Sequence, residues 1–477
     1  MNKSHRVIST TLLSLLLSAS LVAPAVAGAA PLAEPTAGCT GVVQIPMPEC
    51  QALETLYNST AGAQWTDKAG WLVTATPCSW YGVTCQAGHV TALDLQDNNL
   101  SGNLPSQLSD LPSLQSLLLL RNDLAGPIPA SLGSLAQLQE LNLSENDLTG
   151  GIPTQLGVLA QLQKLSLSNN LLTGQIPSQL ASLPALQILD LSTNQLTGQI
   201  PAALSGLSNL EELLLANNQL TGSIPPQLSG LTQLRRLVLT RNQLTGSIPD
   251  QLGSLSALTY LILSFNQLDG AIPASLGSLS QMRFLDLGRN KLTGSIPPEL
   301  ASLSVLQQLW VNSNALTGSI PEGLCNVQSL NYGGDFGFNA ISSAPACALN
   351  IDPFWEETQT VAPADVQVTN LTTNSIRLGW TPIQYTGDGG FYEISYRPAG
   401  GSFTVAGVTA NKNANTFTVA GLAPGQSYDL RVRTYTPAHN TVPAYQQSAL
   451  WSTYAPVTAQ TPSGLMRKVH LPLLKVR

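Results

Sequence analysis

Residues that could carry out acid–base or nucleophilic chemistry are few in this sequence. The four histidines are His5, His89, His439 and His470. None of them stands in a pattern that indicates a Ser-His-Asp catalytic triad. Only His89, which lies near Asp94 and Asp97 in the sequence, remains a candidate for such a triad. The sequence therefore predicts a protein that is not an enzyme.

Paired carboxylates could hydrolyse sugars, and the best candidates are Asp97 and Glu145. Arg121 lies midway between them in the sequence, so each acid would have a cation beside it, and a solvent-exposed salt-bridge ladder is the simpler interpretation. No His or Asp cluster has the spacing of metal ligands, and the cysteines are better used in disulfides. We expect no metal and no cofactor.

Noncovalent recognition is better supported, because aromatic, aliphatic and arginine residues gather between positions 236 and 310. This set comprises Arg236, Val238, Arg241, Tyr260, Ile262, Phe265, Phe284, Asp286, Arg289 and Trp310. Large aromatics together with arginine are typical of binding hot spots. The alternative is that a strand needs β-forming residues and that these aromatics cover one another. We favour a ligand-binding role for this set.

A repeat must position these side chains. Residues 90–329 contain ten copies of a 24-residue unit, LxxLxLxxNxLxGxIPxxLxxLxx, without insertion or deletion. Such a period is the signature of a solenoid, and the alternation at positions 4 to 8 predicts one short strand per coil. Strands one period apart stack as a parallel sheet, which brings positions 3, 5 and 8 of coils 7–10 into neighbouring columns. The candidate residues would then form one patch about 15–20 Å across.

Three invariant positions explain how the coil turns. Position 9 is always asparagine, whose amide can satisfy backbone groups that the turn leaves buried. Position 13 is always glycine, which permits a tight bend, and position 16 is always proline, which holds the opposite wall extended before a 3₁₀ turn. A single coil cannot bury its own leucines, so both ends of the array need caps.

The repeats resemble the leucine-rich repeat family, and LxGxIP is typical of its plant-specific class, found in receptor kinase ectodomains and polygalacturonase inhibitors. The resemblance implies a right-handed superhelix whose concave parallel sheet binds a partner. It also implies an alternative function, inhibition of an extracellular polysaccharide hydrolase. The sequence contains no kinase domain, and its export signal, additional domain and tail look more like bacterial exported proteins.

The chain before the repeats divides into two parts. Residues 1–27 have a basic start, an apolar run and small residues at the end, as in a secretory signal peptide. Residues 28–89 resemble the N-terminal cap of such repeats, with helical spacing between Ala52 and Ala63 and tryptophans that we expect in the core.

The six cysteines of this exported chain suggest three disulfides. Cys325 and Cys347 are about one coil apart, which suits a disulfide between neighbouring coils. For the other four we pair neighbours in the sequence, with Cys50–Cys78 as the main competitor. These pairs are Cys39–Cys50 and Cys78–Cys85.

The chain after the repeats changes character. Residues 330–360 are expected to form a C-terminal cap and linker. Residues 361–462 contain short alternating segments separated by turns, which predict a β-sandwich. Trp380 and the run from Leu422 to Tyr428 resemble the core tryptophan and tyrosine corner of fibronectin type III domains, most simply a spacer. Residues 463–477 form a basic and apolar tail.

Charge and hydropathy limit the partners. The formal net charge is −7, and it becomes −9 without the two basic residues of the signal peptide, which argues against nucleic acid. Only the signal peptide is apolar over a long run, so no transmembrane span is expected. We predict a secreted or cell-surface monomer, and an extracellular protein or glycan as its partner.

Overall fold

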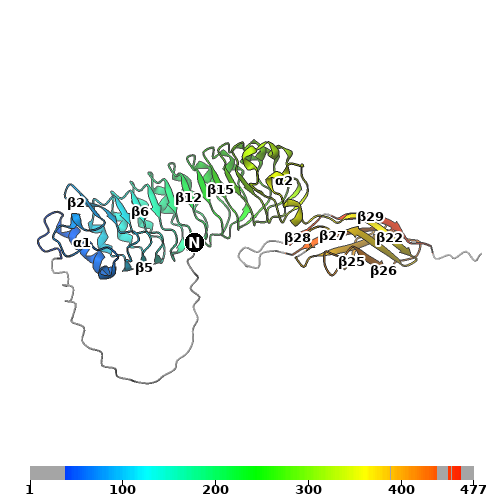
Figure 1. Cartoon of the computed structure of the whole chain (residues 1–477), viewed down its shortest axis with the longest axis horizontal. Helices are drawn as coiled ribbons and strands as arrows, with labels where there is room; N and C mark the ends of the chain where they lie inside the picture. Colours follow the sequence, from blue (N-terminus) through cyan, green and yellow to red (C-terminus); the bar gives the residue numbers. More distant parts are fainter. Residues whose placement is uncertain (1–37, 387, 438–448, 453, 464–477) are drawn as a thin grey trace, which may run out of the picture.

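The computed structural model of the chain describes residues 38–386, 388–437, 449–452 and 454–463. These residues form an elongated solenoid of stacked coils followed by a β-sandwich (Figure 1). The predicted fold, a leucine-rich repeat solenoid with a helical N-terminal cap and an all-β C-terminal part, is confirmed. The predicted signal peptide, His439, His470 and nearly all of the tail lie outside the described residues. No described helix is long and apolar enough to cross a bilayer.

The N-terminal cap is built on helix α1 (Met47–Ser59), which begins earlier than the spacing of its leucines predicts. Leu53 and Leu56 are fully buried, and the helix packs against the first 3₁₀ turn of the array, η3 (Ser106–Asp110). Trp65 and Trp71 pack with Tyr57 at centroid distances of 5.2 and 6.0 Å. These aromatics are core residues, as the sequence predicts.

Short elements then connect the helix to the first coil. They are η1 (Gly62–Gln64), η2 (Pro77–Ser79) and β1 (Val83–Gln86). Strand β1 pairs antiparallel with β2 (His89–Asp94), the first strand of the array. The structure joins Cys39 to Cys50 and Cys78 to Cys85, which are the pairings between neighbours in the sequence.

One side of the solenoid is a twelve-stranded sheet in which β1 precedes eleven parallel strands. After β2 these are β4 (Ser116–Leu118), β6 (Glu140–Asn142), β8 (Lys164–Ser166), β10 (Ile188–Asp190), β12 (Glu212–Leu214), β13 (Arg236–Val238), β15 (Tyr260–Ile262), β17 (Phe284–Asp286), β18 (Gln308–Trp310) and β20 (Gly334–Asp335). The register follows the sequence period, so Leu189 pairs with Leu165 on one side and Leu213 on the other. Residues at the same position of successive coils are therefore direct neighbours.

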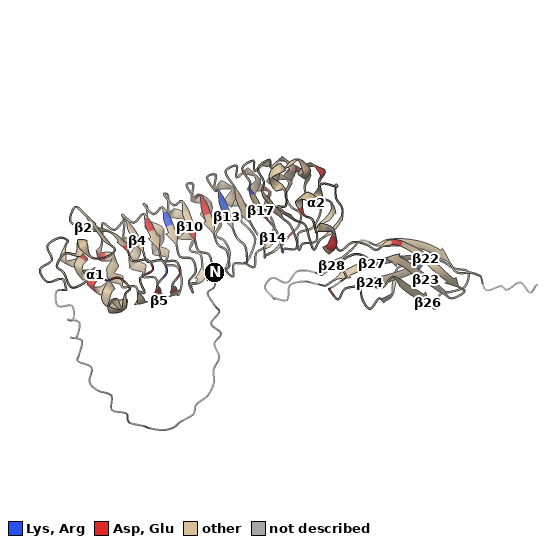
Figure 2. Cartoon of the chain, in the orientation of Figure 1, with Lys and Arg blue, Asp and Glu red and all other residues tan. Residues whose placement is uncertain are grey.

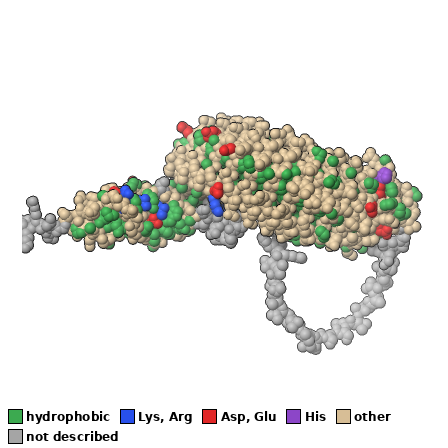
Figure 3. All heavy atoms as spheres, turned by 180° about the vertical axis from the view of Figure 1, so that it is seen from behind, with side chains coloured by type: hydrophobic (Ala, Val, Ile, Leu, Met, Phe, Trp, Pro, Cys, Tyr) green, Lys and Arg blue, Asp and Glu red, His purple; other side chains and the backbone are tan. Residues whose placement is uncertain are grey.

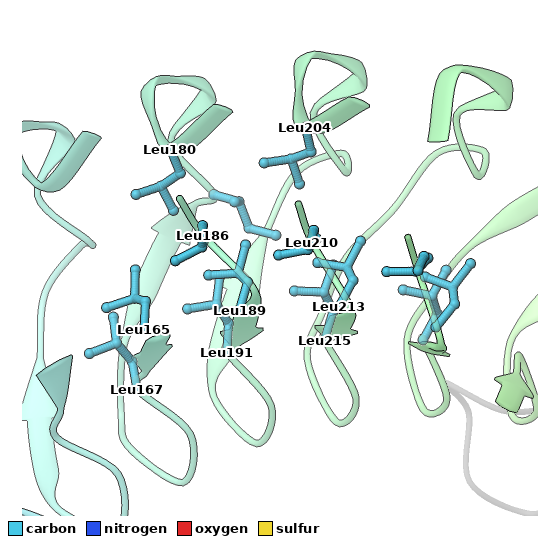
Figure 4. Packing of buried hydrophobic residues seen from close by; sticks show 14 of the residues in the cluster. Leu165, Leu167, Leu180, Leu186, Leu189, Leu191, Leu204, Leu210, Leu213 and Leu215 are labelled. Atoms are coloured by element: carbon cyan, nitrogen blue, oxygen red, sulfur yellow. The ribbon is translucent and has the colours of Figure 1, made fainter. Parts of the chain in front are cut away.

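The interior is a continuous column of leucines. Leu165, Leu189 and Leu213 of the strands and Leu180 and Leu204 of the 3₁₀ turns point toward one another inside the coils (Figure 4). All five are completely buried. Each coil covers the leucine side chains of the next coil. The leucines of the first and last coils therefore have to be covered by caps.

The opposite wall is also hydrogen-bonded as short parallel ladders, which the sequence did not predict. Its strands are β3 (Ser101–Asn103), β5 (Asp123–Pro127), β7 (Asp147–Thr149), β9 (Thr173–Gln175), β11 (Gln195–Thr197), β14 (Thr245–Ser247), β16 (Gln267–Asp269), β19 (Thr317–Ser319) and β21 (Ala340–Ser343). In each coil of the array this wall leads into a five-residue 3₁₀ turn that begins directly after the invariant proline. After η3 these turns are η4 (Ala130–Ser134), η5 (Thr154–Val158), η6 (Ser178–Ser182), η7 (Ala202–Gly206), η8 (Pro226–Gly230), η9 (Asp250–Ser254), η10 (Ala274–Ser278), η11 (Pro298–Ser302) and η12 (Glu322–Asn326).

The twelve-stranded sheet is the face that the resemblance predicts to be concave, and the invariant asparagine closes the turn after its strands. In coil 5, Asn194 donates from Nδ2 to the carbonyls of Leu167, Leu191 and Ser192 at 3.0–3.2 Å. Its Oδ1 accepts from the amide of Leu172 in the preceding coil at 3.0 Å. The residue before each asparagine has a positive φ, as at Thr193 (55°). This left-handed position is not evident from the sequence, because no glycine occupies it.

A C-terminal cap ends the array. It contains η13 (Gln328–Leu330), β20, β21, helix α2 (Ala348–Ile351) and η14 (Trp355–Thr358). Cys325 is joined to Cys347 of this cap. Asn339 continues the asparagine column one residue out of step, and it still donates to the carbonyls of Val311 and Phe336. The cap is thus an eleventh, irregular coil.

The β-sandwich has two antiparallel sheets. One contains β22 (Ala364–Thr372), β23 (Ser375–Thr381) and β26 (Thr416–Ala420), and the other contains β24 (Phe391–Pro398), β25 (Thr404–Val408), β27 (Ser427–Thr436), β28 (Leu450–Trp451) and β29 (Ala455–Gln460). Trp380 is buried between the sheets, and the Tyr428 hydroxyl accepts a hydrogen bond from the amide of Ala423. This is the tyrosine corner that the sequence predicts.

The solenoid cap and the sandwich touch through specific side chains. Phe338 lies edge-on to Tyr385 at 5.5 Å between ring centroids. Thr360 donates to the hydroxyl of Thr436 at 2.7 Å, and Lys412, fully buried in the sandwich, donates to the same hydroxyl at 2.9 Å. These contacts connect the sandwich to the last coil.

Candidate functional site

Three aromatic side chains lie side by side on the concave sheet near the C-terminal end of the array. Tyr260 and Phe284 are partners in the β15–β17 ladder, with ring centroids 5.4 Å apart and planes 25° apart. Trp310 of β18 meets Phe284 edge-on at 6.0 Å and is 38% exposed. We call Tyr260, Phe284 and Trp310 the aromatic patch.

Arginines border the aromatic patch on two sides. Arg236 lies 5.5 Å from the Tyr260 ring centroid and also pairs with Glu212 of the preceding strand at 3.2 Å. At position 8 of the coils, Phe265 is flanked by Arg241, whose guanidinium carbon lies 4.5 Å from the ring centroid, and by Arg289 at 4.9 Å. Stacking on an aromatic ring holds a guanidinium in place while leaving its edge available to a ligand.

The column between these two sets contains Val238, Ile262, Asp286 and Trp310, which follow one another in the parallel register. Val238 and Ile262 are half-buried, but Asp286 is only 9% exposed, less than its outward position predicts. Its carboxylate accepts from the Ser264 hydroxyl at 2.6 Å and from the Gly288 amide at 3.1 Å. Burial raises the pKa of Asp286 above its ordinary value, and these two hydrogen bonds oppose the rise.

A hollow of about 240 Å³ opens between Asp286 and Trp310. Asp335 of β20, Asn312 and Gly288 also line this hollow. The sequence did not indicate Asp335, Gly288 or Asn312 as site residues. Asp335 could have been found, because it occupies the strand position of Asp286 and Trp310 in the irregular eleventh coil.

The predicted salt-bridge ladder forms near the other end of the sheet. Arg121 contacts Asp97 at 3.1 Å and Glu145 at 2.9 Å, and these carboxylates raise the pKa of Arg121. All three side chains are exposed, so this column is a solvated ion-pair network.

His89 takes part in the N-terminal cap. Its Nδ1 lies 2.5 Å from Oε1 of Glu49, whose Oε2 accepts from the Val90 amide, and Glu49 is 2% exposed. The partner of His89 is therefore Glu49, and the bond anchors helix α1 to the first strand. Within the described residues no group of three or more His, Cys, Asp or Glu could hold a metal ion.

The surface around these sites carries little charge. Most of the solenoid ribbon has neither acidic nor basic side chains, and a basic strand is visible at β13 (Figure 2). From behind, most of the solenoid surface is neither charged nor hydrophobic, with scattered hydrophobic side chains, whereas hydrophobic and basic side chains gather on the sandwich (Figure 3).

Comparison with known families agrees with this geometry. Leucine-rich repeat models match residues 89–111, 137–159, 160–220, 208–253, 257–279, 281–303 and 305–327, and the fibronectin type III domain model matches residues 361–447. The chain is a leucine-rich repeat protein with a fibronectin type III domain.

Two curated relatives of this leucine-rich repeat protein come from Arabidopsis thaliana. A "Probable leucine-rich repeat receptor-like protein kinase" is 45% identical over 67 residues, which are 14% of this chain and 10% of the relative. "Leucine-rich repeat protein 2" is 50% identical over 46 residues, 9% of this chain and 21% of the relative. The chain therefore spans only a small part of either relative.

Two solved structures resemble the leucine-rich repeat solenoid. The Arabidopsis receptor kinase HAESA, in complex with the peptide hormone IDA and the co-receptor SERK1, is 35% identical with a TM-score of 0.54, over 61% of this chain and 50% of HAESA. A plant ice-binding protein is 32% identical with a TM-score of 0.55, over 64% of this chain and 97% of that protein. All these matches are plant proteins, so they do not support the bacterial source expected from the sequence.

Proposed function

We propose that this chain is a non-catalytic extracellular recognition protein whose aromatic patch and bordering arginines bind a peptide or a peptide segment of a protein partner. The observation that carries the proposal is the partly exposed Trp310, packed edge-on against Phe284 on a rigid parallel sheet. Pre-positioned aromatic rings lose little conformational entropy on binding, which is why they dominate binding energy at protein interfaces.

Two further features support a peptide as the partner. The patch runs across successive strands that are about 4.8 Å apart. An extended peptide laid across the coils would therefore meet a new side chain of the patch at each coil. The similar solenoid of HAESA is known in complex with a peptide hormone, although this chain covers only half of that protein. A secreted or cell-surface location follows from such a role and is consistent with the three disulfides.

The test is binding of the full chain to arrays of extracellular peptides, proteins and glycans, compared with the Trp310→Ala variant. We expect peptide or protein hits that the variant loses, because truncation removes the largest exposed ring. Hits that survive in the variant would place recognition elsewhere on the surface. Hits restricted to acidic glycans would replace the peptide with a sugar ligand bound by Arg241 and Arg289.

Inhibition of an extracellular polysaccharide hydrolase is an alternative use of the same face. It is favoured by Arg241 and Arg289, which hold two guanidinium groups on either side of Phe265. Inhibition of a polygalacturonase by the purified chain, abolished in Arg241→Ala/Arg289→Ala, would support this function. An enzyme that remains fully active with excess chain would rule against it.

Ice binding is a second candidate, at a different surface. The wall opposite the concave sheet carries a row of exposed threonines at the same position of coils 3 to 7, including Thr197, Thr221 and Thr245, and Asp269 occupies that position in coil 8. An evenly spaced, uncharged and rigid row of hydroxyls could match a lattice of water, and one similar structure is a plant ice-binding protein. Growth of ice crystals in the presence of the chain, compared with Thr221→Lys/Thr245→Lys, tests this use. Unaltered ice growth with the unmutated chain would exclude it.

A further inference from the structure

The hollow beside the aromatic patch places an indole between two carboxylates. Asp286, Trp310 and Asp335 follow one another in the parallel register of β17, β18 and β20. Strands in such a sheet are about 4.8 Å apart, so an acidic side chain flanks Trp310 on each side. A group resting on the indole would therefore reach both carboxylates.

Gly288 leaves room for such a group. The corresponding residue in the preceding coils is Ser264 and Thr240, and in the next coil Asn312. A Cβ built on Gly288 would lie 2.4 Å from Oδ1 of Asn312. A side chain at this position would narrow the hollow, so the glycine is one reason for its depth.

The two carboxylates have partners that stabilise their position but do not neutralise their charge. Asp286 accepts from the Ser264 hydroxyl and the Gly288 amide, and Asp335 accepts from the Gly337 amide at 3.2 Å. Arg289 also lines the hollow, and its charge acts on both carboxylates, but in the part of the chain that the structure describes it forms no ion pair with either.

Burial raises the pKa of both Asp286 and Asp335, and Asp352 adds a repulsion at Asp335 that Arg289 partly offsets. The folded protein thus bears the cost of two desolvated acids that face a common space. A ligand cation placed between them would relieve that cost.

We propose that this hollow binds the guanidinium group of an arginine side chain in the partner peptide. The planar guanidinium fits the open face of Trp310 by stacking, and its fork of N–H donors suits carboxylates on two sides. An ammonium group lacks that plane and fork, which is why arginine is favoured over lysine. The inference deepens the proposed peptide recognition and depends on it, since it assigns one residue type to the bound segment.

The experiment measures binding of N-acetyl-arginine amide to the full chain by ligand-detected NMR titration. N-acetyl-citrulline amide serves as the matched uncharged probe, and N-acetyl-lysine amide as the matched ammonium. We expect the arginine probe to bind, and each of Asp286→Asn, Asp335→Asn and Trp310→Ala to weaken it about tenfold or more. Asp190→Asn is the control, because Asp190 occupies the same strand position and accepts from the amide of Ser192 at 3.0 Å, but far from this hollow.

A second readout is the pH dependence of the titration. The arginine probe should bind less tightly as pH falls through the raised pKa values of Asp286 and Asp335, since protonation removes the charge that attracts it. Gly288→Ser should weaken binding of the arginine probe, because the added side chain fills the hollow while Asp286 and Asp335 stay unchanged.

Several results would overturn the inference. One is that the arginine probe fails to bind the unmutated chain, and another is that the citrulline probe binds with the same affinity as the arginine probe. A third is that Asp190→Asn weakens binding of the arginine probe as much as Asp286→Asn does. If array partners are still lost in Trp310→Ala while the arginine probe fails to bind, the peptide-binding face stands and only the arginine assignment is refuted.

Discussion

Replacing Asn218 by alanine tests how the asparagine column stabilises the solenoid. Asn218 is 5% exposed and donates from Nδ2 to the carbonyls of Leu191, Leu215 and Ala216 at 3.0, 3.2 and 3.3 Å. Its Oδ1 accepts from the Leu196 amide of the preceding coil at 3.0 Å. Alanine leaves this amide and these carbonyls without the side chain that serves them, in a site closed to bulk water. An unpaired buried amide costs ~1–3 kcal/mol and each unpaired carbonyl costs less. We therefore expect the free energy of unfolding to fall by about 3–5 kcal/mol.

The assay is urea unfolding followed by circular dichroism, with Gln219→Ala as the matched control. Gln219 is the next residue in the chain, but it is exposed, so its replacement should change stability by no more than about 0.5 kcal/mol. Hydrogen exchange of the Leu196 amide gives a local reading, because its acceptor is removed. If Asn218→Ala lost less than ~1 kcal/mol and left that exchange rate unchanged, the asparagine column would not be a major source of stability.

Three further predictions concern backbone strain, burial and pH. Thr193→Gly should raise the free energy of unfolding by up to about 1 kcal/mol, since φ is +55° there, and a lower value in urea unfolding would contradict this. Lys412→Met should destabilise the sandwich by about 3–5 kcal/mol, because it removes the cation of a buried ion pair 2.7 Å long; an unshifted calorimetric transition would refute it. Because the pKa of Asp286 is raised in the folded state, the folded state binds more protons than the unfolded state at pH values above 3.8, the ordinary pKa of this side chain. The contribution of Asp286 to the free energy of unfolding therefore falls as pH rises above 3.8. Asp286→Asn should thus gain stability relative to the unmutated chain at neutral pH and lose that gain at low pH, whereas a pH-independent difference in urea unfolding would contradict the assignment.

The concave sheet could be predicted because a 24-residue period and a two-residue alternation fix both the strand and its register. Once the register is known, the neighbours of Tyr260, Phe284 and Trp310 follow by counting. The ladders of the opposite wall could not be predicted in this way. Their segments, such as Thr245–Ser247, are short and centred on glycine, and they pair only because the stacked coils bring them together.

The depth of the site was less predictable than its outline. Asp286 occupies an outward position, but the hydroxyl of Ser264 and the neighbouring Trp310 enclose it, and such burial depends on side-chain packing between coils. Asp335 can be found only by counting back from Asn339, because the glycine pair at 333–334 and a one-residue shift obscure the repeat in the eleventh coil. The left-handed turn at Thr193 could not be predicted, because a positive φ is typical of glycine and not of threonine.

The most direct test of peptide recognition by the aromatic patch is calorimetric titration of the strongest array partner into the Phe284→Ala/Trp310→Ala variant. Ile188→Ala/Leu214→Ala is the matched control, since it removes apolar side chains from the same two strand positions in coils 5 and 6. We predict that the first pair weakens binding by at least about 2 kcal/mol, roughly thirtyfold, while the control changes little. Equal affinities of both variants for the partner would contradict the assignment of the binding site to coils 7–10.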